Sequence, residues 1–189
     1  MSQQVRLVRH GETEWSRTGR HTSRTDLPLT GTGEARARGL GELLAAESFA
    51  LVLSSPLVRA RRTAELAGFT PELCDDLREW DYGDYEGRTT ADIRAERPGW
   101  SLWTDGCPHG ETAAEVAARA DRVIMRARQT DGDVAVFAHG HVLRVVGARW
   151  IGLPPADGRL LALSTAGVCV LGLERETAVL ERWNYGPSR

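Results

Sequence analysis

The sequence contains little cysteine, and its three cysteines, Cys74, Cys107 and Cys169, lie far apart. No two of them have the Cys-x-x-Cys spacing that is typical of zinc sites. Three thiols in 189 residues are also too few for the disulfide framework of a small secreted domain. We therefore expect neither a cysteine-rich metal site nor a fold that depends on disulfides.

Long apolar runs and a strong charge of one sign are missing as well. No stretch is long enough to cross a bilayer, and the polar segment Met1–Gln4 leads into the first apolar segment without the core of a signal peptide. The formal net charge of -2 predicts no nucleic-acid partner and no membrane partner. We expect a cytoplasmic protein, and its oligomeric state stays open, with a homodimer as one option.

The composition is that of a globular protein, with 41% hydrophobic and 26% charged residues. Short apolar segments alternate with amphipathic ones, and no repeat, low-complexity segment or linker divides the chain. This pattern predicts one domain over residues 1–189, folded as a three-layer α/β/α sandwich with a mainly parallel sheet. Residues 88–110, which are irregular and rich in large apolar anchors, are expected to form a lid-like insertion after the third strand.

Periodicity and capping signals place the individual elements. Strands are expected near residues 5–8, 49–53, 73–77, 133–138, 160–163, 168–173 and 178–185. Helices are expected at 30–46 behind Thr30 as N-cap, after Pro56, weakly at 89–96, at 111–128 with the Thr112–Glu115 capping-box spacing, and at 142–151. Residues 14–30 are expected to form a long functional loop.

Two apolar segments end in the same way, in His-Gly. The first runs into Arg9, His10 and Gly11, and the second into His139 and Gly140. A glycine at this point permits a sharp exit from a strand. Parallel strands bring their carboxyl ends to one edge of the sheet, where α/β proteins bind ligands. We therefore expect both histidines to reach the same site.

Arg59, in the first turn of the helix after Pro56, is expected at the same edge. Together with Arg9 it supplies two guanidinium groups, whose planar forks match phosphate oxygens. The N-termini of the helices after Pro56 and His141 would add backbone N–H groups for an anion. The alternatives are a structural histidine beside a surface arginine, and a solvated basic helix face, which suits at least one of Arg61 and Arg62.

Four separated motifs together resemble the histidine phosphatase superfamily, the phosphoglycerate-mutase-like group. They are Arg9-His10-Gly11-Glu12-Thr13, the segment 54–60, Leu77-Arg78-Glu79 with the segment 83–87, and Ala138-His139-Gly140-His141. They occur in the family's order over nearly the whole chain. The segments 22–30, 77–87 and 103–107 are similar to the branch that includes sedoheptulose-bisphosphatase and small sugar-phosphate phosphatases.

This resemblance implies a phosphomonoesterase that needs no metal or cofactor and hydrolyses a small phosphorylated metabolite, a sugar phosphate or bisphosphate. His10 would attack phosphorus and form a phosphohistidine. Arg9, Arg59 and His139 would hold the phosphate oxygens, and Glu79 would protonate the leaving alkoxide and then activate water. Asp81 or Glu86 are alternatives for the acid.

The resemblance also implies substrate-binding roles for Ser16, Thr22 and Ser23, on the loop that borders the phosphate, and for Tyr82. Mutase relatives often carry Asn at the place of Ser16.

Other candidates are interpreted as structural. His21 and His109 are expected to be solvated loop residues, whereas His141 and Arg144 are expected mainly to cap and pack their helix. Asp75 and Asp76 are interpreted as a charged turn.

Three other functions remain open. A phosphoglycerate mutase would use the same phosphohistidine but return the phosphate to its substrate. A catalytically silent module that binds a phosphorylated ligand would not need Glu79. A protein-phosphohistidine phosphatase would need a more open site than the aromatic insertion at 88–110 suggests.

Overall fold

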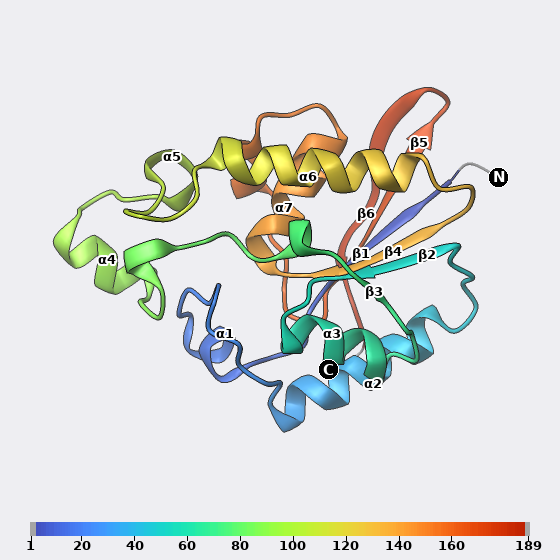
Figure 1. Cartoon of the computed structure of the whole chain (residues 1–189), viewed down its shortest axis with the longest axis horizontal. Helices are drawn as coiled ribbons and strands as arrows, with labels where there is room; N and C mark the ends of the chain where they lie inside the picture. Colours follow the sequence, from blue (N-terminus) through green and yellow to red (C-terminus); the bar gives the residue numbers. More distant parts are fainter. Residues whose placement is uncertain (1–2, 188–189) are drawn as a thin grey trace.

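A six-stranded sheet separates two layers of helices (Figure 1). The computed structural model describes residues 3–187. The strand order is β3-β2-β4-β1-β5-β6. The strands are β1 (Val5–Arg9), β2 (Leu51–Ser54), β3 (Glu72–Leu73), β4 (Val134–Ala138), β5 (Val168–Glu174) and β6 (Thr177–Tyr185). The first four strands are parallel to one another, whereas β5 pairs antiparallel with both β1 and β6, which confirms the mainly parallel sheet.

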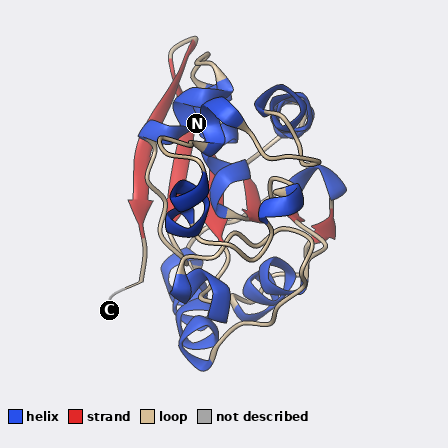
Figure 2. Ribbon diagram, turned by 90° about the vertical axis from the view of Figure 1, so that its left-hand side faces the viewer, coloured by secondary structure: helices blue, strands red, loops and turns tan. Residues whose placement is uncertain are grey.

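Each face of the sheet has its own core. Val8 and Phe137 pack with residues of α2 (Gly31–Leu44) and α3 (Val58–Leu66), whereas Leu7 and Val136 pack with residues of α6 (Ala113–Arg128) and α7 (Gly140–Trp150). Successive residues of a strand point to opposite faces, so one apolar strand contributes to both cores. Figure 2 shows helices on both sides of the strands. The three-layer prediction is confirmed.

Local signals explain where the long helices begin. The Thr30 side chain accepts a hydrogen bond from Gly33 N at 3.0 Å, as expected of an N-cap. Thr112 and Glu115 form the capping box that their spacing predicts.

Three predicted elements differ in the structure. The predicted strand 73–77 is reduced to two residues, because Asp75–Leu77 form a 3-10 turn in which the two aspartates bind Arg78 and Arg122. The predicted strand 160–163 is absent from the described chain, where a 3-10 turn over Pro155–Leu160 runs into irregular structure. The expected loop 14–30 begins with a short helix, α1 (Glu14–Thr18), which a capping box starts.

Three short helices lie together beyond one end of the sheet (Figure 1). They are α1, α4 (Thr90–Glu96) and α5 (Leu102–Asp105), of which the last two belong to the segment 88–110. Two further 3-10 turns span Gly83–Tyr85 and Pro155–Leu160. Within residues 3–187, no helix combines the length and the apolar character needed to span a membrane.

The start of α2 packs directly on the backbone that follows His10. A Cβ atom on Gly33 would lie 2.2 Å from the Glu12 carbonyl oxygen, and one on Gly11 would lie 2.5 Å from the Gly33 oxygen. Only two facing glycines allow this approach. The first turn of α2 therefore fixes the loop that carries the His-Gly motif.

We predict that Gly33→Ala destabilises the protein by about 1–3 kcal/mol, because the added methyl group forces two backbone segments apart. Thermal unfolding should show a Tm lower by roughly 2–10 °C. Gly31→Ala in the same turn is the matched control, since a Cβ there meets nothing within 4 Å. Equal Tm values for the two variants would contradict the close approach.

Candidate active site

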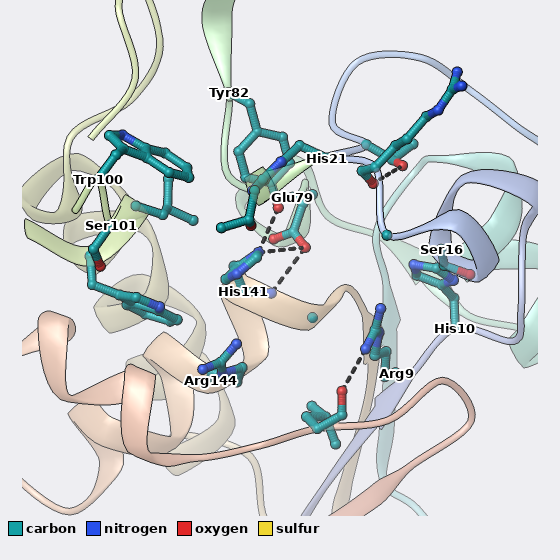
Figure 3. A pocket seen from close by; sticks show the side chains of 18 of the residues that line it. Arg9, His10, Ser16, His21, Glu79, Tyr82, Trp100, Ser101, His141 and Arg144 are labelled. Atoms are coloured by element: carbon teal, nitrogen blue, oxygen red, sulfur yellow. Dashed lines mark hydrogen bonds and ion pairs between the residues drawn. The ribbon is translucent and has the colours of Figure 1, made fainter. Parts of the chain in front are cut away.

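A cavity of ≈ 270 Å³ opens at the carboxyl ends of β1 and β4. The register pairs Arg9 with Ala138, so the residues that follow, His10 and His139, leave the sheet side by side. Their ring centroids are 5.2 Å apart. The segment with α1, the segment with α4 and α5, and the start of α7 contribute the walls (Figure 3). The predicted convergence of the two His-Gly motifs is confirmed.

His10 presents one free ring nitrogen. The ring is 5% exposed, and its Nδ1 lies 2.7 Å from the Gly11 carbonyl oxygen. A carbonyl oxygen only accepts, so Nδ1 carries the hydrogen and Nε2 keeps its lone pair. Burial, followed by the charges of Arg59 and Arg9, holds the pKa of His10 well below its usual value. His10 is thus a neutral imidazole that lines the cavity, with Nε2 available as a nucleophile.

His139 is held from both sides and is completely buried. Arg59 Nε donates to its Nδ1 at 3.1 Å, and its Nε2 lies 2.8 Å from the Ser55 hydroxyl. A guanidinium only donates, so the ring hydrogen is on Nε2 and points to Ser55. Burial, then the charge of Arg59, lowers the pKa of His139 far below the ordinary histidine value.

Arg59 is also completely buried. Its Nη1 donates to the Thr25 carbonyl at 3.0 Å, and its Nη2 donates to those of Thr22 and Ser23 at 3.1 Å. The guanidinium thus holds the loop at residues 22–25 as well as His139. Neither Arg59 nor His139 lines the cavity in this state.

Arg9 lies in the cavity with an unsatisfied donor (Figure 3). Its Nη1 donates to the Leu163 carbonyl at 2.5 Å, but its buried Nε has no partner among residues 3–187. The guanidinium packs against Gly140, the first residue of α7. A Cβ atom added to Gly140 would lie only 3.2 Å from the Arg9 Cζ. The guanidinium is therefore short of acceptors, and an anion in the cavity would supply a charged one.

Glu79 is the acidic residue of the cavity. It is 6% exposed, and its carboxylate accepts hydrogen bonds at 2.9 Å from the backbone N–H groups of Trp80, His141 and Val142. The first turn of α7 therefore orients it. The two alternative acids have other partners: Asp81 pairs with Arg24, and Glu86 accepts from Ser23 N and Thr25 N. Of the three, Glu79 alone lines the cavity within the described chain.

The predicted substrate-binding residues are partly brought together. Ser16, Thr22 and Tyr82 line the cavity. The Ser16 hydroxyl already takes part in the cap of α1. Ser23 does not line the cavity, because its backbone is bound to Glu86 and Arg59.

The interpretation of His21 as a solvated residue is wrong. It is 8% exposed, and its ring contacts those of Tyr82 and Trp100. The sequence carries no local signal for this, since the residues that bury it lie far along the chain. His109 is exposed as expected, although it pairs with Asp84 at 2.9 Å.

His141 and Arg144 line the cavity and do more than cap α7. The Arg144 guanidinium lies over the Trp103 ring at 4.6 Å, and its Nε donates to the Gly158 carbonyl at 3.0 Å. Arg20 and Arg94 also line the wall. The lining thus contains four arginines against one carboxylate, which makes the cavity a receptor for anions.

Residues 3–187 contain no cluster of three or more histidine, cysteine or acidic side chains that could hold a metal ion.

Comparison with known proteins agrees with this geometry. The model of the histidine phosphatase superfamily (branch 1) matches residues 5–186. An acid phosphatase of Mycobacterium tuberculosis is 45% identical over 182 residues, which cover 92% of this chain and 90% of the relative. The sedoheptulose 1,7-bisphosphatase of Saccharomyces cerevisiae is 40% identical, with coverage of 78% and 67%.

Solved structures of phosphatases and related proteins superpose on nearly the whole chain. The product of an open reading frame of Mycobacterium tuberculosis superposes with a TM-score of 0.95 at 41% identity, covering 98% of this chain and 99% of that one. A mycobacterial glucosyl-3-phosphoglycerate phosphatase in complex with vanadate (VO3) superposes with a TM-score of 0.87 at 28% identity, covering 98% and 100%. This chain therefore belongs to branch 1 of the histidine phosphatase superfamily and is a phosphoric monoester hydrolase.

Proposed function

We propose that the protein hydrolyses a small sugar phosphate or sugar bisphosphate through a phosphohistidine on His10. The observation that carries this proposal is the free Nε2 of a neutral His10 in one cavity with the unsatisfied Arg9 and the oriented Glu79. A nucleophile, an anion receptor and an acid are the three groups that transfer of a phosphoryl group requires.

In the first step, the lone pair of His10 Nε2 forms a bond to phosphorus while the bond from phosphorus to the ester oxygen breaks. Glu79, in its protonated form, gives its proton to the departing alkoxide. In the second step, water attacks the phosphohistidine and Glu79 takes a proton from it. Inorganic phosphate leaves, and His10 and Glu79 return to their starting forms.

Arg59 and His139 would act together on the phosphate. In the free protein their hydrogen bonds are to each other, to Ser55 and to the carbonyl groups of the loop 22–25. On binding, the phosphate oxygens would replace some of these neutral acceptors, because a charged acceptor binds a guanidinium more strongly. The charges of Arg9 and Arg59 and the His139 N–H would then stabilise the transferring group.

Two features support a sugar phosphate or bisphosphate as substrate. Arg20, Arg94 and Arg144 line the cavity in addition to Arg9, which is more positive charge than a single phosphate group needs. The yeast relative is a sedoheptulose 1,7-bisphosphatase and a mycobacterial relative is a glucosyl-3-phosphoglycerate phosphatase. The segment 88–110 contributes several wall residues, including Arg94, Trp100 and Trp103, so we assign it the role of a lid.

We predict that His10→Ala lowers phosphate release by at least about 10³-fold, because the nucleophile is lost. The measurement is release of inorganic phosphate, with EDTA present, from a panel of monophosphates, sugar bisphosphates and 3-phosphoglycerate. Acid-quenched wild-type protein should also carry a phosphoryl group on His10. His109→Asn, at an exposed histidine, is the matched control. Interconversion of phosphoglycerates without release of inorganic phosphate would instead indicate a mutase. Absence of both activities would indicate a binding module.

We predict that Glu79→Gln slows the hydrolysis of alkyl phosphates by roughly 10²–10⁴-fold, the usual contribution of a general acid. Aryl phosphates should be affected far less, because a phenolate leaves without a proton. The measurement is kcat/KM for both kinds of ester. Asp81→Asn and Glu86→Gln test the alternative acids, and a dependence on the leaving group in either of them would transfer the role from Glu79.

We predict that Arg59→Met moves the acidic limb of the kcat/KM profile to higher pH. The limb reports the protonation of His10, which attacks only as the neutral form, and the charge of Arg59 helps to lower the pKa of His10. Without that charge the pKa rises, so neutral His10 is lost at a higher pH. Arg61→Met is the control, because Arg61 is exposed on the same helix and pairs with Glu65. An acidic limb at the same pH in both variants would contradict the effect of the Arg59 charge on the pKa of His10.

A further inference from the structure

Two imidazoles in the cavity are used by no step of the reaction. His21 and His141 both line it, with nearly parallel ring planes and ring centroids 6.2 Å apart. Tyr82 contacts both rings, at 4.8 Å and 5.7 Å between centroids. They come from distant parts of the chain, the loop after α1 and the first turn of α7. Figure 3 shows both near Glu79, on the opposite side of Arg9 from His10.

The structure fixes the tautomer of His21. Its Nδ1 lies 2.7 Å from the Arg88 carbonyl oxygen, which can only accept, so Nδ1 carries the hydrogen. Burial lowers the pKa of His21, and the ring is therefore neutral near pH 7. Nε2 is then a bare acceptor, and no donor among residues 3–187 occupies it.

His141 has the opposite tautomer. Its Nδ1 lies 2.6 Å from the Tyr82 hydroxyl, the one hydrogen-bond partner of that hydroxyl within residues 3–187. Burial raises the pKa of Tyr82 well above its usual value, so the phenol keeps its proton. A buried O–H without an acceptor would be costly, so Tyr82 donates to Nδ1. Burial also lowers the pKa of His141, so the ring is neutral, with its single hydrogen on Nε2.

The cavity therefore offers one neutral acceptor and one neutral donor beside its charged groups. Neutral groups do not bind phosphate as strongly as the arginines do. A hydroxyl group both donates and accepts, and matches such a pair. An aryl or plain alkyl group would displace water from His21 Nε2 and the His141 N–H without pairing with either group, which costs affinity.

We propose that His21 Nε2 and His141 Nε2–H recognise hydroxyl groups of the substrate and select phosphorylated polyols and sugars against deoxy analogues. This inference rests on the proposed phosphatase activity and deepens it. His21 and His141 are specificity-determining residues, and Tyr82 is a positioning residue that sets the tautomer of His141.

The test compares kcat/KM within two matched pairs of esters, ribose 5-phosphate with 2-deoxyribose 5-phosphate and glycerol 3-phosphate with propyl phosphate. Wild-type protein should prefer the hydroxylated member by about 3- to 10-fold for each hydrogen bond. His21→Phe and His141→Phe keep an aromatic ring but no ring nitrogen. Each should bring the two kcat/KM values of a pair closer to equality. His109→Asn should keep the wild-type preference.

Ratios within one variant cancel general losses of activity, so damage to folding cannot imitate the result. Nitrogen-15 NMR of the wild-type protein gives a second measurement, which should find hydrogen on Nδ1 of His21 and on Nε2 of His141. Tyr82→Phe removes the donor to His141 Nδ1, so His141 should become a mixture of both tautomers, whereas the tautomer of His21 should stay unchanged. Opposite tautomers, or an unchanged preference in both histidine variants, would overturn the inference. Absence of phosphate release from every ester would instead overturn the proposed function.

Discussion

The direct parallel pairing of β1 with β4 is the constraint on which the site depends. Because Arg9 is in register with Ala138, two strands that are distant in sequence end at the same level, and the residue after each is a histidine. A shift of one residue would turn one of the rings to the other face of the sheet. The facing glycines Gly11 and Gly33 then fix the direction in which the chain leaves β1. Backbone geometry, rather than contacts between side chains, therefore brings His10 and His139 together.

The site buries positive charge, and most of the buried N–H groups of Arg59 are given polar partners. Arg59 is fully buried and has no carboxylate within ion-pairing distance in residues 3–187, yet three carbonyl groups and His139 accept its hydrogen bonds. Burying an unpaired cation costs several kcal/mol, and neutral acceptors offset only part of that cost. Arg9 keeps one buried N–H with no acceptor among residues 3–187. Among residues 3–187 the fold thus holds the charges of Arg9 and Arg59 without a carboxylate in ion-pairing distance, and the phosphate group of the proposed substrate would neutralise them.

The sequence was informative where local rules decide the outcome. Thr30 and Thr112 cap the helices as predicted, and the two His-Gly motifs end neighbouring strands. It was not informative where distant segments meet. The burial of His21 depends on Tyr82 and Trp100, more than 60 residues away, and no periodicity around residue 21 reports it. The predicted strand 73–77 was wrong partly for the same reason. Asp76 binds the distant Arg122, and Asp75 binds the nearby Arg78, while Asp75–Leu77 form a 3-10 turn.

The four histidines at this site differ in which ring nitrogen carries the hydrogen, and therefore in whether they donate or accept a hydrogen bond. All four are neutral because burial lowers the pKa of each. What distinguishes them is the partner of Nδ1: a carbonyl oxygen for His10 and His21, the Arg59 guanidinium for His139, and the Tyr82 hydroxyl for His141. A carbonyl partner leaves Nε2 as a lone pair, whereas a donor partner leaves it as an N–H. The position of one hydrogen on each ring therefore separates two acceptors, of which His10 is the proposed nucleophile, from two donors, without any difference in charge.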